Sequence, residues 1–410
     1  MVSSDSERQS PPWVSVWLNP RLTIERVLTR YSTRQILLLA GLHFSLTVTA
    51  YVIEGELTRA LLDWRVLAAV TGGGLIGIAV LFVAALCFTA SGWVFRGRAT
   101  AADLRATLAW GNAPTVIGLA VCFAILAAWW ISARIGLPQP PPDLVAILVQ
   151  VTQAVVGLWS LVTLLLMLSR VQKFGFWRTT SSYALALLII VFPFFLVRAF
   201  LFEPFNTPSG SMAPSLIVGD YFFVSKYAYG YTRYSLPFSL PLFARRILGR
   251  EPQRGDVVVY RHPRSPSVDF VKRIVGLPGD KIQITEGVVY INGQPVSHAP
   301  LGEYVDPETM QRTKRWHENL PNGVSYEVFD AGNSYLDNTE VYSVPPGRYF
   351  VIGDNRNMSA DSRLPVEQGG GTIPFENLIG RVEAIFFSKD SRAPAGSPPI
   401  RFARIGMAVR

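Results

Sequence analysis

Long apolar runs with few charged residues fill the first half of the chain. A helix needs about 20 apolar residues to cross a bilayer, and five runs approach or exceed that length. They are residues 36–53, 66–95, 115–135, 144–168 and 183–202, the first being the shortest. Gly73 and Gly77, four residues apart, predict a close contact between the second run and another helix. The pattern predicts an α-helical membrane domain with about five transmembrane helices.

Beyond residue 220 the apolar positions alternate with polar ones, which is typical of half-buried strands. Strands are predicted at residues 221–227, 257–260, 270–275, 281–284, 288–291, 348–352 and 381–388. Asn292-Gly293 lies between two of the alternating segments and predicts a tight hairpin. This half of the chain is therefore expected to be a mainly β domain of barrel or sandwich type.

Four Gly-Asp pairs follow or precede the predicted strands. They are Gly219-Asp220, Gly255-Asp256, Gly279-Asp280 and Gly353-Asp354. Because glycine and aspartate both favour turns, we interpret these aspartates as turn residues rather than catalytic carboxylates. Residues 298–339 show little pattern and are interpreted as a variable insertion.

Composition and charge agree with a membrane protein. Half of the 410 residues are hydrophobic and only 16% are charged. Positive residues gather before the first run and after the second and fourth: Arg21, Arg26, Arg30, Arg34, Arg96, Arg98, Arg105, Arg170, Lys173 and Arg178. The positive-inside rule places these segments in the cytoplasm, so an odd number of spans would put everything after residue 202 outside. These arginines partly explain the net charge of +9, and no basic-aromatic pattern indicates nucleic-acid binding.

The candidate chemistry begins in a bent segment, Pro208-Ser209-Gly210-Ser211-Met212-Ala213-Pro214, directly after the last apolar run. Here Gly210 is expected to let the backbone expose the Ser211 hydroxyl. A serine needs a neighbouring base to become a nucleophile. Lys272, in the apolar run 269–275, is the candidate, because desolvation lowers the pKa of a lysine.

Two alternatives remain open at this point. Ser211 and Lys272 are also compatible with a turn serine and an edge-strand charge. The second is a Ser-His-Asp arrangement, whose members occur in different orders along different chains, and His262 would be its best base. The four histidines and two cysteines show no metal-binding spacing, and Gly369-Gly370-Gly371 lacks the residues of a phosphate loop. No metal and no cofactor are predicted.

Four segments together resemble the conserved boxes of type I signal (leader) peptidases. They are PSGSMAPSLIVGD (208–220), RGDVVVYRHP (254–263), FVKRIVGLPGD (270–280) and GDNRNMSADSR (353–363). They occur in the order of that family and cover most of the chain from about residue 184 to 388. The resemblance implies a membrane-bound serine endopeptidase with a Ser211–Lys272 catalytic dyad.

The resemblance also implies supporting roles. The Ser211 backbone N–H and the Ser209 hydroxyl would bind the oxyanion, and Ser359 would hydrogen-bond and orient Lys272. Asp361 and Arg363 would form a supporting ion pair. Asn357-Met358 stands where the family usually has Asp-Asn, which affects the packing of this loop. Shallow apolar pockets for the substrate are expected near three residues: Pro208, Met212 and Phe270.

The same resemblance implies partners and a location. The substrates would be exported preproteins with small residues, A-x-A-like, before the cleaved bond. Further expected partners are the secretion machinery and membrane lipids, the latter through the aromatic and arginine side chains of residues 231–250. The expected location is the bacterial inner (plasma) membrane, with a cytoplasmic N-terminus and the catalytic domain on the periplasmic or outer side.

The segment WVSVWLNPRLTIERVLTR (13–30) and the spans that follow it resemble the Yip family of multi-spanning membrane proteins. We therefore expect a Yip-like domain over residues 1–180, a membrane anchor at 181–202, a catalytic domain at 203–392 and a tail at 393–410. A rival interpretation is a membrane scaffold or trafficking protein with an inactive peptidase-like domain.

Overall fold

The structure, a computed structural model, describes residues 10–53, 64–235, 239, 245–264, 267–305, 312–332, 334–368, 370–390 and 400–409. Contacts divide the chain into two units, Met1–Pro193 and Phe194–Arg410. Each unit is described by itself.

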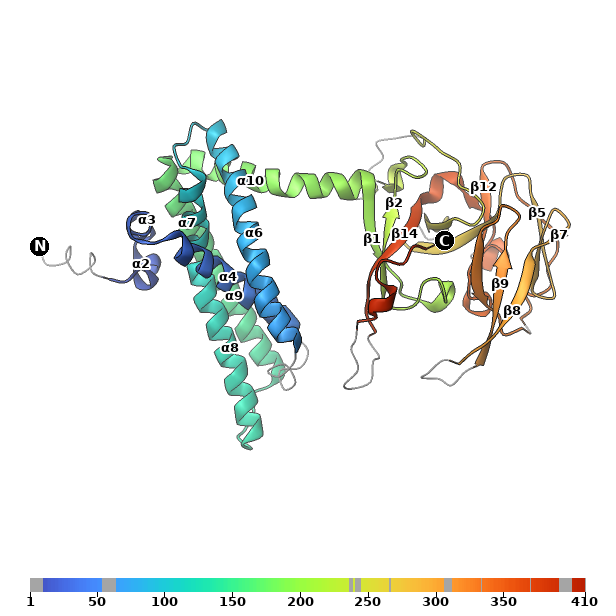
Figure 1. Cartoon of the computed structure of the whole chain (residues 1–410), viewed down its shortest axis with the longest axis horizontal. Coiled ribbons are helices and arrows are strands. Elements are labelled where there is room, and N and C mark those ends of the chain that lie inside the picture. The colour runs from blue at the N-terminus through green and yellow to red at the C-terminus, as the bar shows by residue number, and fades with distance from the viewer. Residues whose placement is uncertain are drawn as a thin grey trace, which may run out of the picture. The chain divides into compact units, whose positions relative to one another are not determined.

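The first unit is helical: α6, α8 and α9 run alongside one another, and α10 lies across them (Figure 1). Its helices are α2 (Pro12–Leu18), α3 (Pro20–Arg30), α4 (Thr33–Ile53), α6 (Trp64–Val94), α7 (Ala101–Gly111), α8 (Ala113–Arg134), α9 (Pro142–Gln172) and α10 (Phe176–Leu196). Helix α3 begins where the Asn19 side chain accepts a bond from the Leu22 N–H. A capping box of Thr100 and Asp103 begins α7.

Four helical segments in the described part of the chain are long and apolar enough to cross a membrane. They are Val70–Val94, Ala101–Arg134, Pro142–Gln172 and Phe176–Leu201. They overlap four of the five predicted runs, so the chain is a multi-pass membrane protein. The remaining run, 36–53, lies in α4, a 21-residue helix that is not among these four segments. Its crossing of the membrane stays a prediction.

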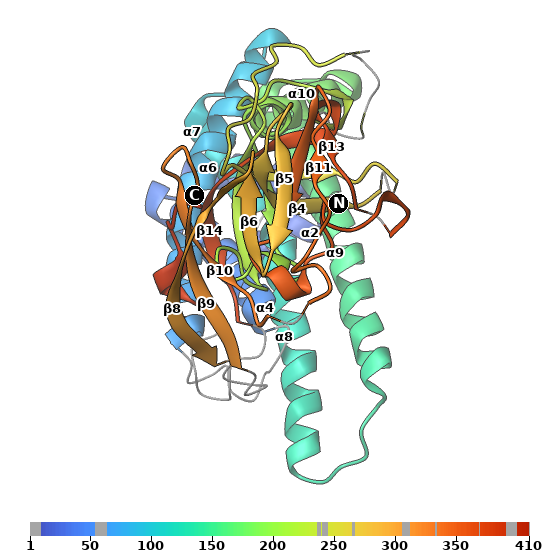
Figure 2. The same cartoon turned by 90° about the vertical axis from the view of Figure 1, so that its right-hand side faces the viewer.

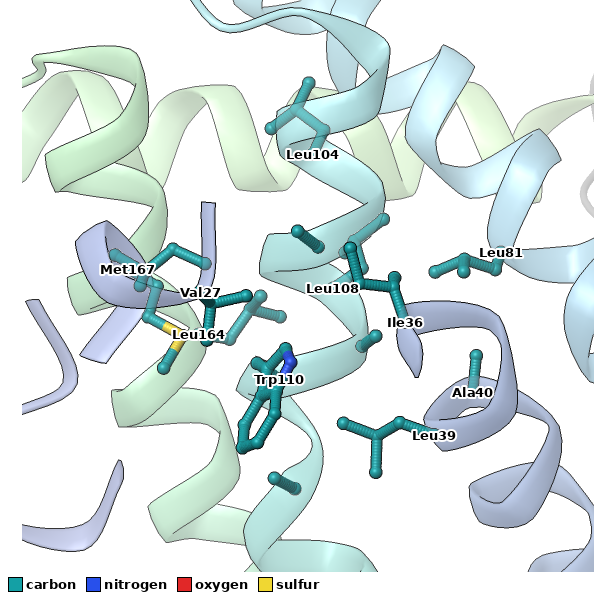
Figure 3. Packing of buried hydrophobic residues seen from close by; sticks show 14 of the residues in the cluster. Val27, Ile36, Leu39, Ala40, Leu81, Leu104, Leu108, Trp110, Leu164 and Met167 are labelled. Carbon is teal, nitrogen blue, oxygen red and sulfur yellow. The ribbon is translucent and has the colours of Figure 1, made fainter. Parts of the chain in front are cut away.

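Buried apolar side chains from several helices meet around Trp110 (Figure 3). The rings of Trp13 and Tyr31 lie 5.2 Å from the Trp110 ring, so the N-terminal helices pack on α7. Glycines bring α4 and α6 together: a Cβ added at Gly77 would come within 2.4 Å of the Phe44 Cβ. The contact predicted for Gly73 and Gly77 is therefore present.

The second unit is mainly β, as predicted. Its largest sheet has seven strands in the order β1 (Phe202–Asn206), β2 (Asp220–Ser225), β14 (Leu378–Ser388), β3 (Val257–Arg261), β4 (Asp269–Gly276), β12 (Arg348–Ile352) and β13 (Ile373–Pro374). A four-stranded sheet has the order β11 (Tyr342–Ser343), β5 (Lys281–Thr285), β6 (Val288–Ile291) and β7 (Gln294–Pro295). Strands β10 (Ser325–Phe329), β9 (Arg312–Asn319) and β8 (Ser297–Val305) form a third sheet (Figure 2).

Every predicted strand is present, and the predicted hairpin joins β6 to β7. Asn292 and Gly293 have φ values of 54° and 80°, the left-handed pair that this turn needs. The structure adds strands that the pattern did not predict. Strand β1 directly follows the last membrane helix, and β8, β9 and β10 lie within residues 298–339 apart from Ser297.

Three of the four Gly-Asp pairs are turns, and the fourth is not. Gly219, Gly255 and Gly279 have φ values near 90°, and each following aspartate accepts a bond from a backbone N–H three residues earlier. Gly353 is not among the left-handed glycines. Asp354 lies in a bend, but among the described residues its carboxylate accepts from the Ser215 and Arg273 side chains rather than from a turn N–H, so it differs from the other three aspartates.

The exit from the last membrane helix is fixed by Glu203 on β1. Its carboxylate pairs with Arg198 at 3.1 Å and with the buried Lys226 at 2.7 Å. These bonds hold β1 against the edge of β2 at the start of the second unit. The segment that carries Ser211 begins directly after β1.

Candidate active site

Ser211 lies in a single 3₁₀ turn, Gly210–Met212, whose position is set by Met212. The Met212 side chain is only 1% exposed and packs among Leu216, Phe222 and Val259. Anchored in this way, the turn leaves Ser211 half-buried and Pro208 exposed. Met212 is thus a core residue, and its expected part in a substrate pocket stays a prediction.

Gly210 does not act as expected. It is not among the glycines with a left-handed backbone, so its conformation does not require a glycine. A Cβ at this position would only touch the end of the Met358 side chain, at 3.9 Å. The turn therefore exposes Ser211 because Met212 anchors it.

Lys272 lies on β4 opposite Val258 of β3, and its amine points to Ser211 in the Gly210–Met212 turn. Its Nζ donates to Ser211 Oγ at 3.1 Å and to the Val271 carbonyl oxygen at 3.0 Å. The Ser209 hydroxyl donates to Ser211 Oγ at 3.3 Å. The structure thus brings together three of the predicted site residues: Ser209, Ser211 and Lys272.

The environment of Lys272 favours its neutral form. Its side chain is 2% exposed, and burial lowers its pKa from 10.5 to about 8, although Asp361 and Asp354 nearby oppose this shift. The Phe270 ring lies 5.5 Å from Nζ. A substantial fraction of neutral amine therefore exists in mildly alkaline solution.

Asp361 and Arg363 form a buried two-bond ion pair beside the lysine strand. The guanidinium donates at 2.8 Å and 2.9 Å, and the Gly353 N–H donates to the same carboxylate at 3.0 Å. Burial alone would raise the pKa of Asp361, but Arg363 and these hydrogen bonds hold it below its usual value. Asp361 therefore stays ionised and joins Gly353 at the start of the loop to Arg363 at its end.

Ser359 does not make its expected contact. Its side chain is buried, and its hydroxyl lies near the Asp361 carboxylate, whose pKa it helps to lower, rather than near the Lys272 amine. A Cβ at Gly353 would come within 2.2 Å of this oxygen and within 2.6 Å of the Ser211 carbonyl oxygen. Ser359 and the nucleophile turn thus pack against the same glycine, and the predicted bond from Ser359 to Lys272 is absent.

Asp354 and Arg273 join the lysine strand to the loop of residues 353–363. The Arg273 guanidinium donates to the Asp354 carboxylate at 2.8 Å and 2.7 Å, and both side chains are 1% exposed. The Asn355 N–H donates to the Ser211 carbonyl oxygen at 3.1 Å. Because Arg273 follows Lys272 and Asn355 follows Asp354, these bonds fix Lys272 relative to Ser211.

Glu318 is a second buried support that was not predicted from the sequence. Its carboxylate accepts from Arg356 Nη2 at 2.5 Å and Tyr326 Oη at 2.8 Å, and lies 3.2 Å from His298 Nδ1. Arg363 in turn donates to the Arg356 carbonyl oxygen at 2.8 Å. Arg356 lies inside the last predicted box, but Glu318 lies in a stretch without pattern.

The remaining candidates lie around Phe270. The His262 ring lies 4.9 Å from the Phe270 ring, and the Tyr260 ring stacks on the same Phe270 ring at 6.0 Å. Ser211 Oγ has its hydrogen bonds from Lys272 and Ser209, which favours the lysine as base. Within the described residues, no group of three or more His, Cys, Asp or Glu side chains could hold a metal ion.

Comparisons with known proteins match the part of the chain that contains all four boxes. The sequence model of the family "Signal peptidase, peptidase S26" matches residues 180–387, about half of the chain. The chain belongs to this family. "Signal peptidase I" of Rickettsia conorii is 44% identical over 202 residues, covering 47% of this chain and 74% of that protein. The Rickettsia canadensis signal peptidase I is 40% identical over 220 residues, with 52% and 81% covered.

Two further matches complete the comparison. Residues 14–198 match the Yip1 domain, which confirms the predicted resemblance of the membrane region. A crystal structure of a signal peptidase I from Enterococcus faecalis V583 is 27% identical and covers 32% of this chain and 97% of its own. Its TM-score is 0.20, so family membership rests on the sequence matches.

Proposed function

We propose that this signal peptidase family member is a membrane-bound serine endopeptidase that removes N-terminal signal peptides from exported preproteins. The observation that carries the proposal is the 3.1 Å contact between Lys272 Nζ and Ser211 Oγ. It joins a buried lysine with a lowered pKa to a half-buried serine. A base must lie within hydrogen-bond reach of its nucleophile, and a lowered pKa makes its neutral form available to accept the proton.

In the proposed reaction, neutral Lys272 accepts the Ser211 proton while Oγ attacks the carbonyl carbon of the substrate. The C–N bond then breaks, and the Lys272 ammonium returns its proton to the leaving amine. The acyl-enzyme is cleared by water, whose proton passes to Lys272 as the hydroxide oxygen bonds to the acyl carbon. When the ester bond breaks, Ser211 takes this proton back and the dyad is restored.

The oxyanion of each tetrahedral intermediate would accept bonds from the Ser211 backbone N–H and the Ser209 hydroxyl. The Ser209 hydroxyl already lies 3.3 Å from Ser211 Oγ, and its rotation would turn it toward the substrate oxygen. Asp361 with Arg363, and Ser359 packed on Gly353, would hold the loop beneath the dyad. Their roles are positioning roles.

The substrates would be preproteins with A-x-A-like residues before the cleaved bond. Exposed Pro208 and half-buried Phe270 flank the dyad along the chain and support a shallow binding surface, with Met212 beneath it. The secretion machinery and membrane lipids would be further partners. For lipid contact by residues 231–250, most of the expected apolar side chains lie outside the described residues, and Arg246 instead bonds the Gly230 and Leu378 carbonyl oxygens.

The protein would reside in a bacterial inner membrane with a cytoplasmic N-terminus and the peptidase unit on the outer side. The four candidate spans and the gathered arginines support this arrangement, with α4 as the fifth span. The proposed domain limits are 1–180, 181–202, 203–392 and 393–410.

The test is to incubate the purified full-length protein with a labelled preprotein, comparing wild type with Ser211→Ala. The wild type should release one fragment whose new N-terminus follows an A-x-A-like site, and Ser211→Ala should release none. If folded wild-type protein leaves several different preproteins uncut, the proposal is wrong and the inactive scaffold remains.

A further inference from the structure

A polar cavity of about 780 Å³ lies in the helical unit and has no part in the proposed peptidase reaction. Its lining comes from α3, the start of α7 and the end of α9. Three candidate spans begin or end there: Ala101–Arg134, Pro142–Gln172 and Phe176–Leu201. The cavity is therefore at the level where the bundle leaves the apolar part of the membrane. Its volume is within the range of about 300–1,000 Å³ that small-molecule sites have.

The charges in this cavity do not cancel. Glu25 pairs with Arg170, and the Asp103 carboxylate accepts from Thr100 N and Oγ1 at 2.9 Å and 2.8 Å. Both carboxylates thus already have partners within the protein. Arg21 and Lys173 also line the cavity, and neither has an ion-pair partner among the residues that the structure describes.

Lys173 has a backbone conformation that favours glycine or asparagine. It ends α9 with φ 57° and ψ 42°, the left-handed conformation in which glycine or asparagine is usual. A positive charge near a helix C-terminus is favourable throughout the last turn, so the helix dipole does not require a lysine at this strained position. Strained residues gather at binding sites, where the position of the side chain is what matters.

We propose that this cavity binds the phosphate-bearing headgroup of an anionic phospholipid, with Arg21 and Lys173 as the phosphate ligands. Basic pockets between membrane helices are suited to such headgroups. Apolar lining residues support a lipid rather than a soluble phosphate: Leu28 is 38% exposed and Phe174 lies beside Lys173. Leu28 would contact the glycerol and the first acyl carbons, and Phe174, which is 9% exposed, forms part of the cavity wall.

The test measures binding of fluorescent phosphatidylglycerol and fluorescent phosphatidylcholine to the purified full-length protein in detergent. The wild type should bind phosphatidylglycerol more tightly. Arg21→Gln with Lys173→Gly should weaken it by about fivefold per charge removed, or about 25-fold together. Lys173→Gly removes the charge and relieves the left-handed backbone, so it should not lower the melting temperature.

Arg178→Gln is the matched control, because Arg178 is an exposed arginine just beyond the cavity that does not line it. It should leave phosphatidylglycerol binding unchanged. Equal binding of the two lipids by the wild type, or unchanged binding by the double variant, would overturn the proposal. So would displacement of the lipid by inorganic phosphate at equal concentration, since the cavity would then be a site for free phosphate.

Discussion

At the scale of single residues, burial decides what Lys272 can do. The surrounding apolar strands lower its pKa to about 8, while the carboxylates of Asp361 and Asp354 prevent a larger shift. A lysine left at its ordinary value would be almost wholly protonated at neutral pH and could not accept the Ser211 proton. Replacing these carboxylates would change the proton affinity of the base without touching the nucleophile.

The first prediction is the pH dependence of cleavage. Because the folded-state pKa of Lys272 is about 8, the neutral amine, and with it kcat/KM, should rise as the pH increases through that value and then level off. Initial rates on one preprotein measured between about pH 6 and pH 10 give the profile. A rate that is flat across this interval, or that falls as the pH rises toward 8, contradicts a lysine base.

Two glycines near Ser211 should respond oppositely to alanine. At Gly353 the added Cβ would come within 2.2 Å of Ser359 Oγ and 2.6 Å of the Ser211 carbonyl oxygen, so the nucleophile turn must move. A displacement of about 1 Å is enough to cost on the order of 100-fold in rate. Gly210→Ala, right beside the nucleophile, meets only Met358 at 3.9 Å and should keep most of the activity.

This second prediction is checked by measuring turnover and melting temperature of both variants. Equal activity of the two alanine variants would show that the packing of Gly353 does not position Ser211. The comparison is informative because sequence position alone suggests the reverse order.

At the scale of elements, the third sheet supports the loop of residues 353–363 through Glu318. The carboxylate of Glu318 is fully buried, and although burial opposes ionisation, Arg356, His298 and Tyr326 lower its pKa to about 2. Its ionised form therefore contributes stability above its usual pKa of 4.5, and this contribution is lost as the pH falls toward 2.

The third prediction compares two glutamates of the third sheet, each paired with an arginine. Glu318→Gln leaves Arg356 buried without its anion and should cost about 3–5 kcal/mol of stability, with lower turnover. Glu327→Gln breaks the pair with Arg315, whose side chains are 39% and 35% exposed, and should cost less than about 1 kcal/mol. Unfolding of the two variants in one detergent at pH 7 measures the difference. Similar losses in both would remove Glu318 from its supporting role.

How much could be predicted from the sequence differed between elements. Strands such as Val288–Ile291 and Arg348–Ile352 were predicted at their observed bounds, because alternation and turn residues mark them locally. Strand β1 was missed because its five residues, FEPFN, include a proline and show no clear alternation of apolar and polar positions. Strand β8 is almost wholly exposed and strand β9 is rich in charged residues, so neither shows an apolar alternation, and their pairing with each other is what makes them strands.

Among the site residues too, those with a local sequence signal were predicted and those that depend on distant partners were not. Ser211 and Lys272 were identified because each lies in a local motif with its own chemistry. The roles of Asp354 and Glu318 depend on arginines far away in sequence, and no local pattern indicates such partners. Met212 was placed near a substrate pocket by the resemblance alone, and only the packed core shows that it anchors the turn.

At the scale of the whole molecule, the residues proposed for catalysis all belong to the second unit. That unit begins at Phe194, within the last candidate span Phe176–Leu201. The preceding helices contribute neither a nucleophile nor a base to the proposed reaction. Their own cavity, with Arg21 and Lys173, indicates a separate role at the membrane.

The fourth prediction follows from this division. A chain that begins near Arg178 keeps the last span and should still insert, with most of its turnover on a preprotein in detergent. In vesicles its efficiency should fall if the removed helices gather substrate or lipid. Full-length and truncated protein are compared at equal folded concentration. A truncated form that melts cooperatively but is inactive in detergent would show that the first unit belongs to the catalytic machinery.

The central claim is that Ser211 and Lys272 act as one catalytic pair. It is tested most directly by the turnover of Ser211→Ala, Lys272→Ala and the double variant on one labelled preprotein at the pH of highest activity. Each single substitution should lower turnover by on the order of 10⁴-fold, and the double variant should be hardly worse than either. Strong cleavage by folded Lys272→Ala, or losses that multiply in the double variant, would contradict the pair.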